Sequence, residues 1–346
     1  MKILVFNPSF LGDSVLTTPL IKAVKSYLSD NPEEEAVVDF CVRPEFAPLF
    51  EGLELINKVI PFDKRGNEKG LSGIFRFAGF LKLGEYDVII SPHKSFRSTL
   101  LLGMTGVIRR IGFRQAAFSF VYPEKVERNM ELHEVERNLM LLEPFITDFA
   151  LEDAKRRGGR PEVFIDESYS EKVSRYFKAA RPGGRVIALA PGSVWATKKW
   201  PAQRFAKVAD MIYEAGDIPL IIGGPMDRDA ADELKSHMRH TPADFCGFIP
   251  LRRLPALIDA CDLLITNDSG PLHIAVAVGT PATAIFGPTV KGLGFFPYTD
   301  NSAVVEEDLY CRPCGLHGGN ECPEEHFRCM LDITPERVYE TAEGLL

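Results

Sequence analysis

Hydrophobic residues follow two alternating patterns along this chain, and together the patterns predict a regular succession of strands and helices. Short apolar runs predict buried strands at 2–7, 36–42, 58–62, 86–90, 186–190, 219–222 and 262–266. Apolar residues at helical spacing predict helices at 11–28, 71–83, 133–145, 167–180, 201–215, 227–238, 272–278 and 334–344. This alternation is typical of α/β proteins, in which helices cover both faces of a parallel sheet.

The segment 261–287, CDLLITNDSGPLHIAVAVGTPATAIFG, has the pattern strand, turn, helix, strand. Pro271 is predicted in the first turn of the helix, where a missing N–H costs nothing, and Asp268 or Ser269 is predicted to cap the free backbone donors. A helix N-terminus at the end of a strand suits a phosphate group. Capped strand-to-helix turns are also common in proteins where they bind no ligand.

The charged, glycine-containing segment 152–161 interrupts the alternation, and we place a domain boundary there. The chain of 346 residues is long enough for two domains with full cores, predicted at 1–160 and 161–346. Both halves have the pattern of a Rossmann-like, doubly wound sheet. The expected active site is the cleft between them, faced by the carboxyl ends of both sets of strands.

Composition excludes several classes of function. Hydrophobic residues make up 45% and charged residues 25%, and no apolar run approaches the length of a membrane span. The first apolar run ends at Asn7-Pro8 and predicts a strand rather than a secretory signal, so a cytoplasmic protein is expected. The net charge of -8 argues against nucleic-acid binding. No GxGxxG or Walker motif supports a dinucleotide or P-loop site.

Basic residues gather in the segment 88–123, which contains no Asp or Glu. They are Lys94, Arg97, Arg109, Arg110 and Arg114, together with His93. Either this is a solvated face neutralised by acidic groups from elsewhere, or it binds an anionic partner, since arginine holds phosphates in bidentate fashion. His133 and Arg137 lie one helical turn apart and either join this face or are ordinary surface residues.

Polar residues also follow several predicted strands. Asp13 comes after the first strand, where it either caps the next helix or takes part in chemistry at the strand's carboxyl end. The loop 191–201 offers Ser193, Thr197, Lys198 and Lys199, and the strand 219–222 ends at Gly223-Gly224-Pro225. The two lysines are surface charges or phosphate ligands.

Four cysteines near the end of the chain have the spacing CxxC-x7-C-x6-C. They are Cys311, Cys314, Cys322 and Cys329. This spacing is compatible with a structural zinc site. The alternative is free thiols, and disulfides are less expected in a reducing compartment.

Several motifs in this order resemble the ADP-heptose:lipopolysaccharide heptosyltransferase family, glycosyltransferase family nine. They are PSFLGDSVLTTPL, SPHKSFRS, RRIGF, PGSVWATKKWP, GGPMDRD, NDSGPLHIAVAVGTPATAIFGPT and LDITPERV, and they span nearly the whole chain. The resemblance implies two Rossmann-like domains of the glycosyltransferase type B architecture, with the acceptor on the N-terminal half and the sugar nucleotide on the C-terminal half.

The resemblance also implies roles for individual residues. Asp13 would be the general base, and Lys198 would contact the diphosphate of ADP-heptose. The residues implied in donor binding are Ser193, Lys198, Gly223, Gly224, Asp227, Asp268, Ser269, Gly270 and His273. The residues expected to bind the phosphorylated lipid A-core acceptor, and with it the cytoplasmic face of the inner membrane, are Lys94, Arg97 and Arg110.

The chemistry expected of these residues needs no cofactor. A carboxylate takes the proton of the acceptor hydroxyl, and Lys198 with a helix N-terminus stabilises the departing ADP. The resemblance implies a single displacement that inverts the anomeric carbon. Two other hypotheses stay open: a sugar-nucleotide epimerase of similar two-domain shape, and a non-catalytic nucleotide-binding protein. A sugar-nucleotide panel assayed with and without a truncated core acceptor separates all three.

Overall fold

The computed structural model describes residues 1–30 and 36–346 of the chain. It divides the chain into two compact units, unit 1 at Met1–Phe164 and unit 2 at Ile165–Leu346. The predicted boundary lay between 160 and 161, within the last residues of unit 1. Each unit is described by itself below.

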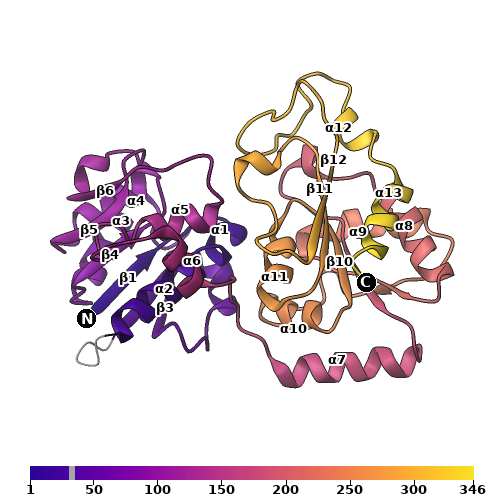
Figure 1. Ribbon diagram of the computed structural model, residues 1–346, viewed down its shortest axis with the longest axis horizontal. Helices are drawn as coiled ribbons and strands as arrows, with labels where there is room; N and C mark the ends of the chain where they lie inside the picture. Colours follow the sequence, from indigo (N-terminus) through magenta and orange to yellow (C-terminus); the bar gives the residue numbers. More distant parts are fainter. Residues whose placement is uncertain (31–35) are drawn as a thin grey trace. The chain divides into compact units, whose positions relative to one another are not determined.

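Unit 1 contains one parallel sheet in which the described residues form six strands, in the order β3-β2-β1-β4-β5-β6. The strands are β1 (Lys2–Phe6), β2 (Val37–Val42), β3 (Lys58–Pro61), β4 (Val88–Ser91), β5 (Arg109–Phe113) and β6 (Glu124–Val126). The helical segments are α1 (Leu11–Val15), α2 (Thr18–Ser29), η1 (Pro44–Leu49), α3 (Gly70–Lys82), α4 (Phe96–Gly103), η2 (Ser119–Val121), α5 (Glu134–Met140) and α6 (Leu151–Gly158). Figure 1 shows β1 and β4 at the middle of this sheet.

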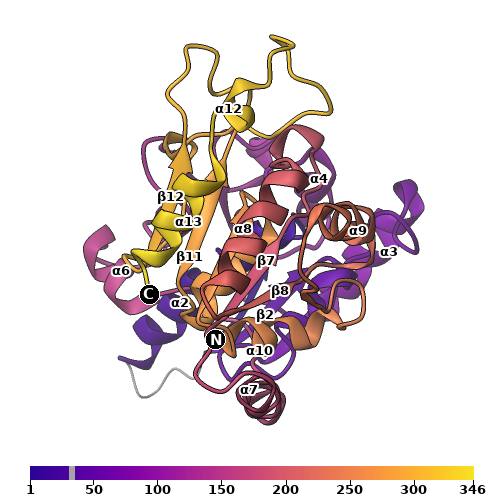
Figure 2. The ribbon, with the colours of Figure 1, turned by 90° about the vertical axis from the view of Figure 1, so that its right-hand side faces the viewer.

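Unit 2 repeats this architecture with the strand order β12-β11-β10-β7-β8-β9, again parallel throughout. The strands are β7 (Val186–Ala190), β8 (Ile218–Ile221), β9 (Ala243–Asp244), β10 (Leu263–Asn267), β11 (Ala282–Phe286) and β12 (Ser302–Glu306). The helical segments are α7 (Glu167–Ala180), η3 (Ala196–Lys198), α8 (Ala202–Glu214), η4 (Pro225–Asp227), α9 (Arg228–His237), η5 (Leu251–Arg253), α10 (Leu254–Asp259), α11 (Gly270–Val278), η6 (Lys291–Leu293), α12 (Arg328–Leu331) and α13 (Pro335–Glu343). Figure 2 shows α8 and α13 side by side.

The predicted fold class is confirmed, because each unit buries the apolar runs of its strands under amphipathic helices. In unit 1 a continuous core joins Leu4 and Phe6 of β1 to Phe77 of α3 and Leu101 of α4. In unit 2 the core joins Leu189 of β7 to helices α8, α9 and α13. Burial of these side chains is the main force that holds each sheet to its helices.

The predicted helix 11–28 is wrong as a single element, because the structure breaks it into α1 and α2. Pro19 stands in the first turn of α2, where it has no N–H to donate to the carbonyl of Val15. The hydroxyl of Thr18 donates to that carbonyl instead, at 2.8 Å. The break turns α1 into a short separate helix directly after β1.

The interruption predicted at 152–161 is also wrong as secondary structure. Most of this segment forms α6, which packs against α2 within unit 1. Its buried face consists of the small residues Ala154 and Gly158, and its charged residues form ion pairs such as Arg157 with Asp153 at 2.8 Å. Because the core-facing residues of α6 are small, its sequence shows little of the apolar periodicity that predicts a helix.

Within the described part of the chain, no helix has the length and apolar character needed to cross a bilayer.

Candidate active site

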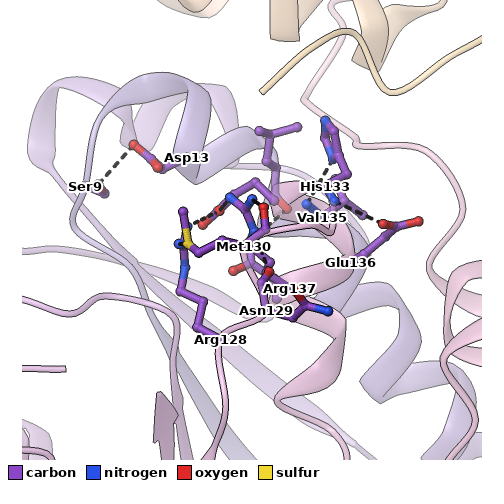
Figure 3. Close-up of polar contacts among 12 residues, drawn as sticks. Ser9, Asp13, Arg128, Asn129, Met130, His133, Val135, Glu136 and Arg137 are labelled. Atoms are coloured by element: carbon purple, nitrogen blue, oxygen red, sulfur yellow. Dashed lines mark hydrogen bonds and ion pairs between the residues drawn. The ribbon is translucent and has the colours of Figure 1, made fainter. Parts of the chain in front are cut away.

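The carboxyl end of β1 in unit 1 leads directly to Asp13. Asp13 is the third residue of α1 and is half-buried. The hydroxyl of Ser9 donates to its Oδ2 at 3.0 Å (Figure 3). The structure therefore fixes the Asp13 side chain at the edge of the sheet where parallel α/β folds bind ligands.

Burial raises the pKa of Asp13 above its ordinary value of 3.8, because removal from water disfavours the charged form. The hydrogen bonds from Ser9 and from the backbone N–H of Phe10 act against this rise, as do the positive charges of Arg128 and Lys94. A carboxylate with a raised pKa takes up a proton more readily than an ordinary aspartate. This is the property that a general base needs.

The alternative that Asp13 is the N-cap residue of the next helix is wrong. Phe10 is the N-cap residue of α1 and Asp13 lies in the first turn, where its carboxylate accepts from the N–H of Phe10. The helix begins at Leu11, as the apolar pattern predicted, so Asp13 lies inside it. Asp13 therefore helps to close the helix start, and this contact does not exclude a chemical role.

A buried ionic network lies next to Asp13 at the start of α5. Glu134 forms ion pairs with Arg128 and, at 3.1 Å, with Arg137. The guanidinium of Arg137 also donates to the carbonyls of Asn129 (3.0 Å) and Met130 (2.5 Å), as Figure 3 shows. Arg137 is fully buried, so the expectation that it is a surface residue is wrong. The network fixes the chain that carries Arg128.

His133 caps α5 rather than joining a basic face. Its Nδ1 accepts from the N–H of Val135 at 3.1 Å, and the carboxylate of Glu136 accepts from the N–H of His133 at 3.0 Å. This reciprocal arrangement is a capping box.

Lys94 follows β4, the strand beside β1, and is half-buried. Burial lowers the pKa of Lys94, the positive charge of Arg128 lowers it further, and the carboxylates of Glu134 and Asp13 oppose the change. The neighbouring His93 belongs to no cationic face, because burial lowers its pKa to about 3 and its Nδ1 lies 2.6 Å from Ser98 Oγ. Of the basic residues after β4, the structure thus places Lys94 in the environment of Asp13.

The other two predicted acceptor residues are held by backbone carbonyls. Arg97, in the first turn of α4, donates to the carbonyls of Lys64 (3.0 Å) and Glu68. Arg110 lies near the start of β5 and donates to the carbonyls of Val107 and Val121. The segment 88–123 is therefore not one continuous anion site, since Lys94 and Arg110 lie toward opposite ends of the parallel strands.

The carboxyl ends of unit 2 bring Lys198 and Asp268 together. Lys198 Nζ lies 2.5 Å from Asp268 Oδ2, and their side chains are 12% and 7% exposed. Thr289, which follows β11, donates to the same carboxylate oxygen at 2.7 Å. Three loops that follow neighbouring strands therefore meet at one buried, charge-assisted cluster.

The start of α11 has the backbone geometry predicted for a phosphate site but not the predicted cap. Pro271 lies in the first turn as expected, and Ser269 is the N-cap residue. Ser269 makes no capping bond through its side chain, and Asp268 is engaged by Lys198 and Thr289, so the predicted capping role is wrong for both. Pro271 has no N–H and the N–H of Leu272 donates to the carbonyl of Ser269 at 3.2 Å, so the uncapped donor at this helix start is the N–H of Gly270.

His273 lies on α11 close to this cluster and is buried. Burial lowers the pKa of His273 to about 4, against the effect of the Asp268 carboxylate. Its Nδ1 has no hydrogen-bond partner among the described residues. A buried, neutral imidazole with an unsatisfied nitrogen is a candidate ligand contact.

Asp227 lies over the ends of β7 and β8. Its Oδ2 accepts from the N–H of Gly224 at 2.9 Å. A Cβ at Gly192 would come within 2.0 Å of Asp227 Oδ1, and one at Gly223 within 2.9 Å of Asp227 Cβ. These glycines are needed for the close approach of Asp227. Ser193 is half-buried in the next position of the same loop.

Cys311, Cys314 and Cys322 belong to the segment between β12 and α12, which extends past the strand ends in Figures 1 and 2, and Cys329 lies in α12. Cys314, Cys322 and Cys329 line one cavity of about 90 Å³, and Cys311 adjoins them, since the thiol of Cys314 donates to the carbonyl of Cys311 at 3.4 Å. All seven cysteines of the chain are free. Among residues 1–30 and 36–346, no group of three or more metal-binding side chains is placed to hold a metal ion. A structural zinc stays a prediction.

This cysteine segment packs against the loop of Lys198. Thr197 and Gly319 form three hydrogen bonds: the N–H of Gly319 donates to the hydroxyl of Thr197 at 2.8 Å, and the N–H and the hydroxyl of Thr197 each donate to the carbonyl of Gly319 at 3.0 Å. A Cβ at Gly318 would come within 2.9 Å of Lys198 Cγ.

The structural zinc is tested by elemental analysis of purified protein. A stoichiometric amount of zinc, and a lower melting temperature after chelation, are the expected results. Protein that contains no stoichiometric metal contradicts the zinc prediction.

Sequence reasoning missed two residues that organise the unit 2 site. Thr289 holds Asp268, and the amide of Asn267 links β10 to the loop after β7 through Pro191 O (2.8 Å) and Trp200 N–H (3.1 Å). Both lie in the quoted motif NDSGPLHIAVAVGTPATAIFGPT, where Asn267 is next to the selected Asp268 and Thr289 is the last residue. Their position just beyond strand ends was the available signal.

Comparison with known proteins identifies the family. A model of glycosyltransferase family 9 (heptosyltransferase) matches residues 74–326. The chain belongs to glycosyltransferase family 9.

Relatives of this glycosyltransferase cover its whole length. It is 28% identical to lipooligosaccharide heptosyltransferase 2 of Campylobacter jejuni, over 100% of this chain and 98% of the relative. A solved family 9 glycosyltransferase from Veillonella parvula matches with a TM-score of 0.83 at 24% identity, over 99% and 96% of the two chains. The solved ADP-heptose lps heptosyltransferase II of E. coli matches with a TM-score of 0.79 at 23% identity, over 100% and 98%. These structures confirm the two-sheet α/β fold, and family membership does not favour the epimerase hypothesis.

Proposed function

We propose that this glycosyltransferase moves a heptose from ADP-L-glycero-D-manno-heptose to the inner core of lipopolysaccharide, with inversion at the anomeric carbon. The proposal is supported by relatives named as heptosyltransferases that align over the full chain, including one described as an ADP-heptose enzyme. The observation that carries it is the cluster of Lys198, Asp268 and the α11 N-terminus at the strand ends of unit 2.

This cluster suits the donor. The N–H of Gly270 at the positive end of α11 and the ammonium of Lys198 can face the diphosphate, where negative charge grows as the sugar leaves. The unsatisfied Nδ1 of His273 and the hydroxyls of Ser193 and Ser269 supply further polar contacts. Unit 2 is accordingly the proposed sugar-nucleotide domain, with Asp227, Gly223 and Gly224 at the neighbouring strand ends.

Unit 1 supplies the acceptor side of the proposal. An acceptor hydroxyl is a weak nucleophile, and Asp13, with its raised pKa, can take the proton as the new bond forms. Lys94 lies in the same electrostatic environment and can bind an acceptor phosphate. The proposal assigns no step to a metal or cofactor, and zinc held by the four cysteines would serve stability alone.

The acceptor is a lipid, so the proposal also includes peripheral contact with the cytoplasmic face of the inner membrane. The basic residues of segment 88–123 support this part, because Lys and Arg near a bilayer are attracted to anionic headgroups.

The test is a transfer assay with a panel of sugar nucleotides and a truncated core acceptor. ADP-heptose is expected to give a heptosylated acceptor and stoichiometric ADP, whereas UDP-N-acetylglucosamine gives neither. Epimerised sugar nucleotide formed without acceptor would overturn the proposal. So would nucleotide binding without turnover of any donor.

A further inference from the structure

Unit 1 exposes a group of large apolar side chains on α3, α4 and η2 that its own core does not use. The exposed fractions are 66% for Leu71, 63% for Phe75, 48% for Phe96, 49% for Phe118 and 73% for Phe120. We call these five residues the aromatic surface. Single exposed apolar residues are normal, but several that gather on neighbouring elements mark an interaction site.

The strand order places the three elements on one face of the sheet. The connections β3 to β4, β4 to β5 and β5 to β6 all step toward the β6 edge, while β1 to β2 steps the other way. Because crossovers between parallel strands are right-handed, α3, α4 and η2 cover one face and α2 covers the other. Figure 1 shows α3 and α4 as neighbours, and α4 also contacts η2.

Two sets of contacts hold the aromatic surface together. The ring centroids of Phe96 and Phe118 are 4.7 Å apart, and those of Phe118 and Phe120 are 5.4 Å apart. Arg97, next to Phe96, donates to the carbonyl of Glu68, just before α3 begins. The first turn of α4 is thereby tied to the start of α3, which carries Leu71 and Phe75 one helical turn apart.

The backbone of Phe118 is strained in the conformation that exposes its ring. Its φ of 57° places a bulky residue in the left-handed region, where non-glycine residues are uncommon. The ring that this conformation presents to Phe96 and Phe120 remains half-exposed. Strain of this kind persists where the local structure serves a function.

The charges within the two segments that carry the aromatic surface are positive, and the flanking Glu68 and Glu85 lie outside them. Neither 69–83 nor 88–123 contains an acidic residue. Lys69, in front of α3, and Lys82, in its last turn, are exposed and make no ion pair in the described part of the chain. Arg114 is also exposed but pairs with Glu127 at 3.2 Å. An apolar face with a basic rim complements an anionic lipid surface, whose headgroups attract cations and whose interior accepts aromatic rings.

We propose that the aromatic surface docks unit 1 onto an anionic lipid bilayer, with its rings in the boundary between headgroups and acyl chains and Lys69 and Lys82 against the headgroups. The proposal extends the proposed function, on which it rests for the lipid-bearing acceptor. Membrane binding through basic residues alone would be lost at high salt, because salt screens their attraction to the headgroups. Binding through inserted rings would persist in part.

Co-sedimentation of the full chain with equimolar phosphatidylethanolamine–phosphatidylglycerol vesicles tests the proposal. Phe75→Ser/Phe120→Ser is expected to lower the partition coefficient by about tenfold, since two exposed rings no longer enter the bilayer. The matched control is Phe248→Ser/Leu316→Ser, two residues of unit 2 that are 70% and 61% exposed. The control is expected to bind like the wild type, and pure phosphatidylcholine vesicles are expected to bind all three proteins weakly.

The proposal would be overturned if the two double variants had equal vesicle partition coefficients. It would also be overturned if the wild-type protein did not bind anionic vesicles. Sedimentation velocity tests the alternative that the aromatic surface binds a second copy of the chain. If Phe75→Ser/Phe120→Ser converts a dimer to monomers and leaves vesicle binding unchanged, this alternative holds and the proposal fails. Transfer to a water-soluble truncated acceptor is measured in parallel. Vesicle binding without any heptosyl transfer by the wild type would overturn the proposed function and leave the docking surface standing.

Discussion

Asp13→Asn is expected to lower heptosyl transfer by roughly 10²- to 10⁴-fold while ADP affinity stays near that of the wild type. Asparagine has nearly the same volume and its amide oxygen can still accept from the hydroxyl of Ser9, which lies 3.0 Å from the carboxylate. What it loses is the ability to take a proton from the acceptor. The measurement is single-turnover transfer at saturating ADP-heptose and acceptor.

Stability should not follow the rate in this variant. The pKa of Asp13 is higher in the folded protein than in the unfolded chain, so ionisation of Asp13 destabilises the fold. This destabilisation is absent at a pH below the pKa of the unfolded chain. It grows as the pH rises through the pKa of the folded protein. At neutral pH, asparagine removes that cost. The melting temperature of Asp13→Asn is therefore expected to be equal to or above that of the wild type, which is typical of a residue kept for function.

The pH dependence gives a second measurement of the same role. A general base works only when deprotonated, so the wild-type rate is expected to fall on the acid side at a pH above the ordinary aspartate value of 3.8. The residual rate of Asp13→Asn should lack this acid limb. If the fall in rate at low pH persists unchanged in Asp13→Asn, the group whose protonation causes it is not Asp13.

Asp166 offers a matched control. It caps α7, and its Oδ1 accepts from the N–H of Tyr169 at 3.1 Å. Asparagine caps a helix about as well as aspartate, so Asp166→Asn is expected to leave both rate and stability close to wild type. If folded Asp13→Asn turns over as fast as this control, Asp13 is only a residue of the helix start.

The edge of each sheet that carries the site was predictable, and so were β1 to β4, β7, β8, β10 and β11, because their signals are local. No strand was predicted from the sequence at β5, β6, β9 or β12. An apolar run such as 262–266 specifies a buried strand without help from distant residues, and polar residues after it must lie at its carboxyl end. That rule alone selected Asp13, Lys198 and Asp268. The break at Pro19 was also local, since proline restricts the residue before it, and could have been predicted.

Burial of charge could not be predicted, because it depends on partners far apart in the sequence. Arg137 has the pattern of a surface helix residue, yet Glu134 and two backbone carbonyls hold it in the interior. Lys198 and Asp268 are 70 positions apart and meet only because β7 and β10 are neighbours in the sheet. A capping role for Asp268 was plausible from its position alone. In the structure its carboxylate instead pairs with Lys198 and accepts a hydrogen bond from Thr289.

That ion pair makes Lys198 the second residue with a large expected effect. Lys198→Met is expected to lower the rate at saturating donor by about 10²-fold, as the loss of one positioned donor to a developing anion does. The variant also leaves the carboxylate of Asp268, 7% exposed, with Thr289 as its remaining side-chain partner. Loss of one partner from a buried pair costs up to roughly 3–5 kcal/mol of stability, so the melting temperature should fall as well.

A double variant separates the two effects. Lys198→Met/Asp268→Asn removes the stranded charge, and it should recover most of the stability while the rate stays low, since no ammonium faces the leaving diphosphate. Lys199→Met is the matched control, because Lys199 is the exposed neighbour in the same loop and should be dispensable. If the double variant regains the rate together with the melting temperature, Lys198 acts by holding Asp268 in place and not by stabilising ADP.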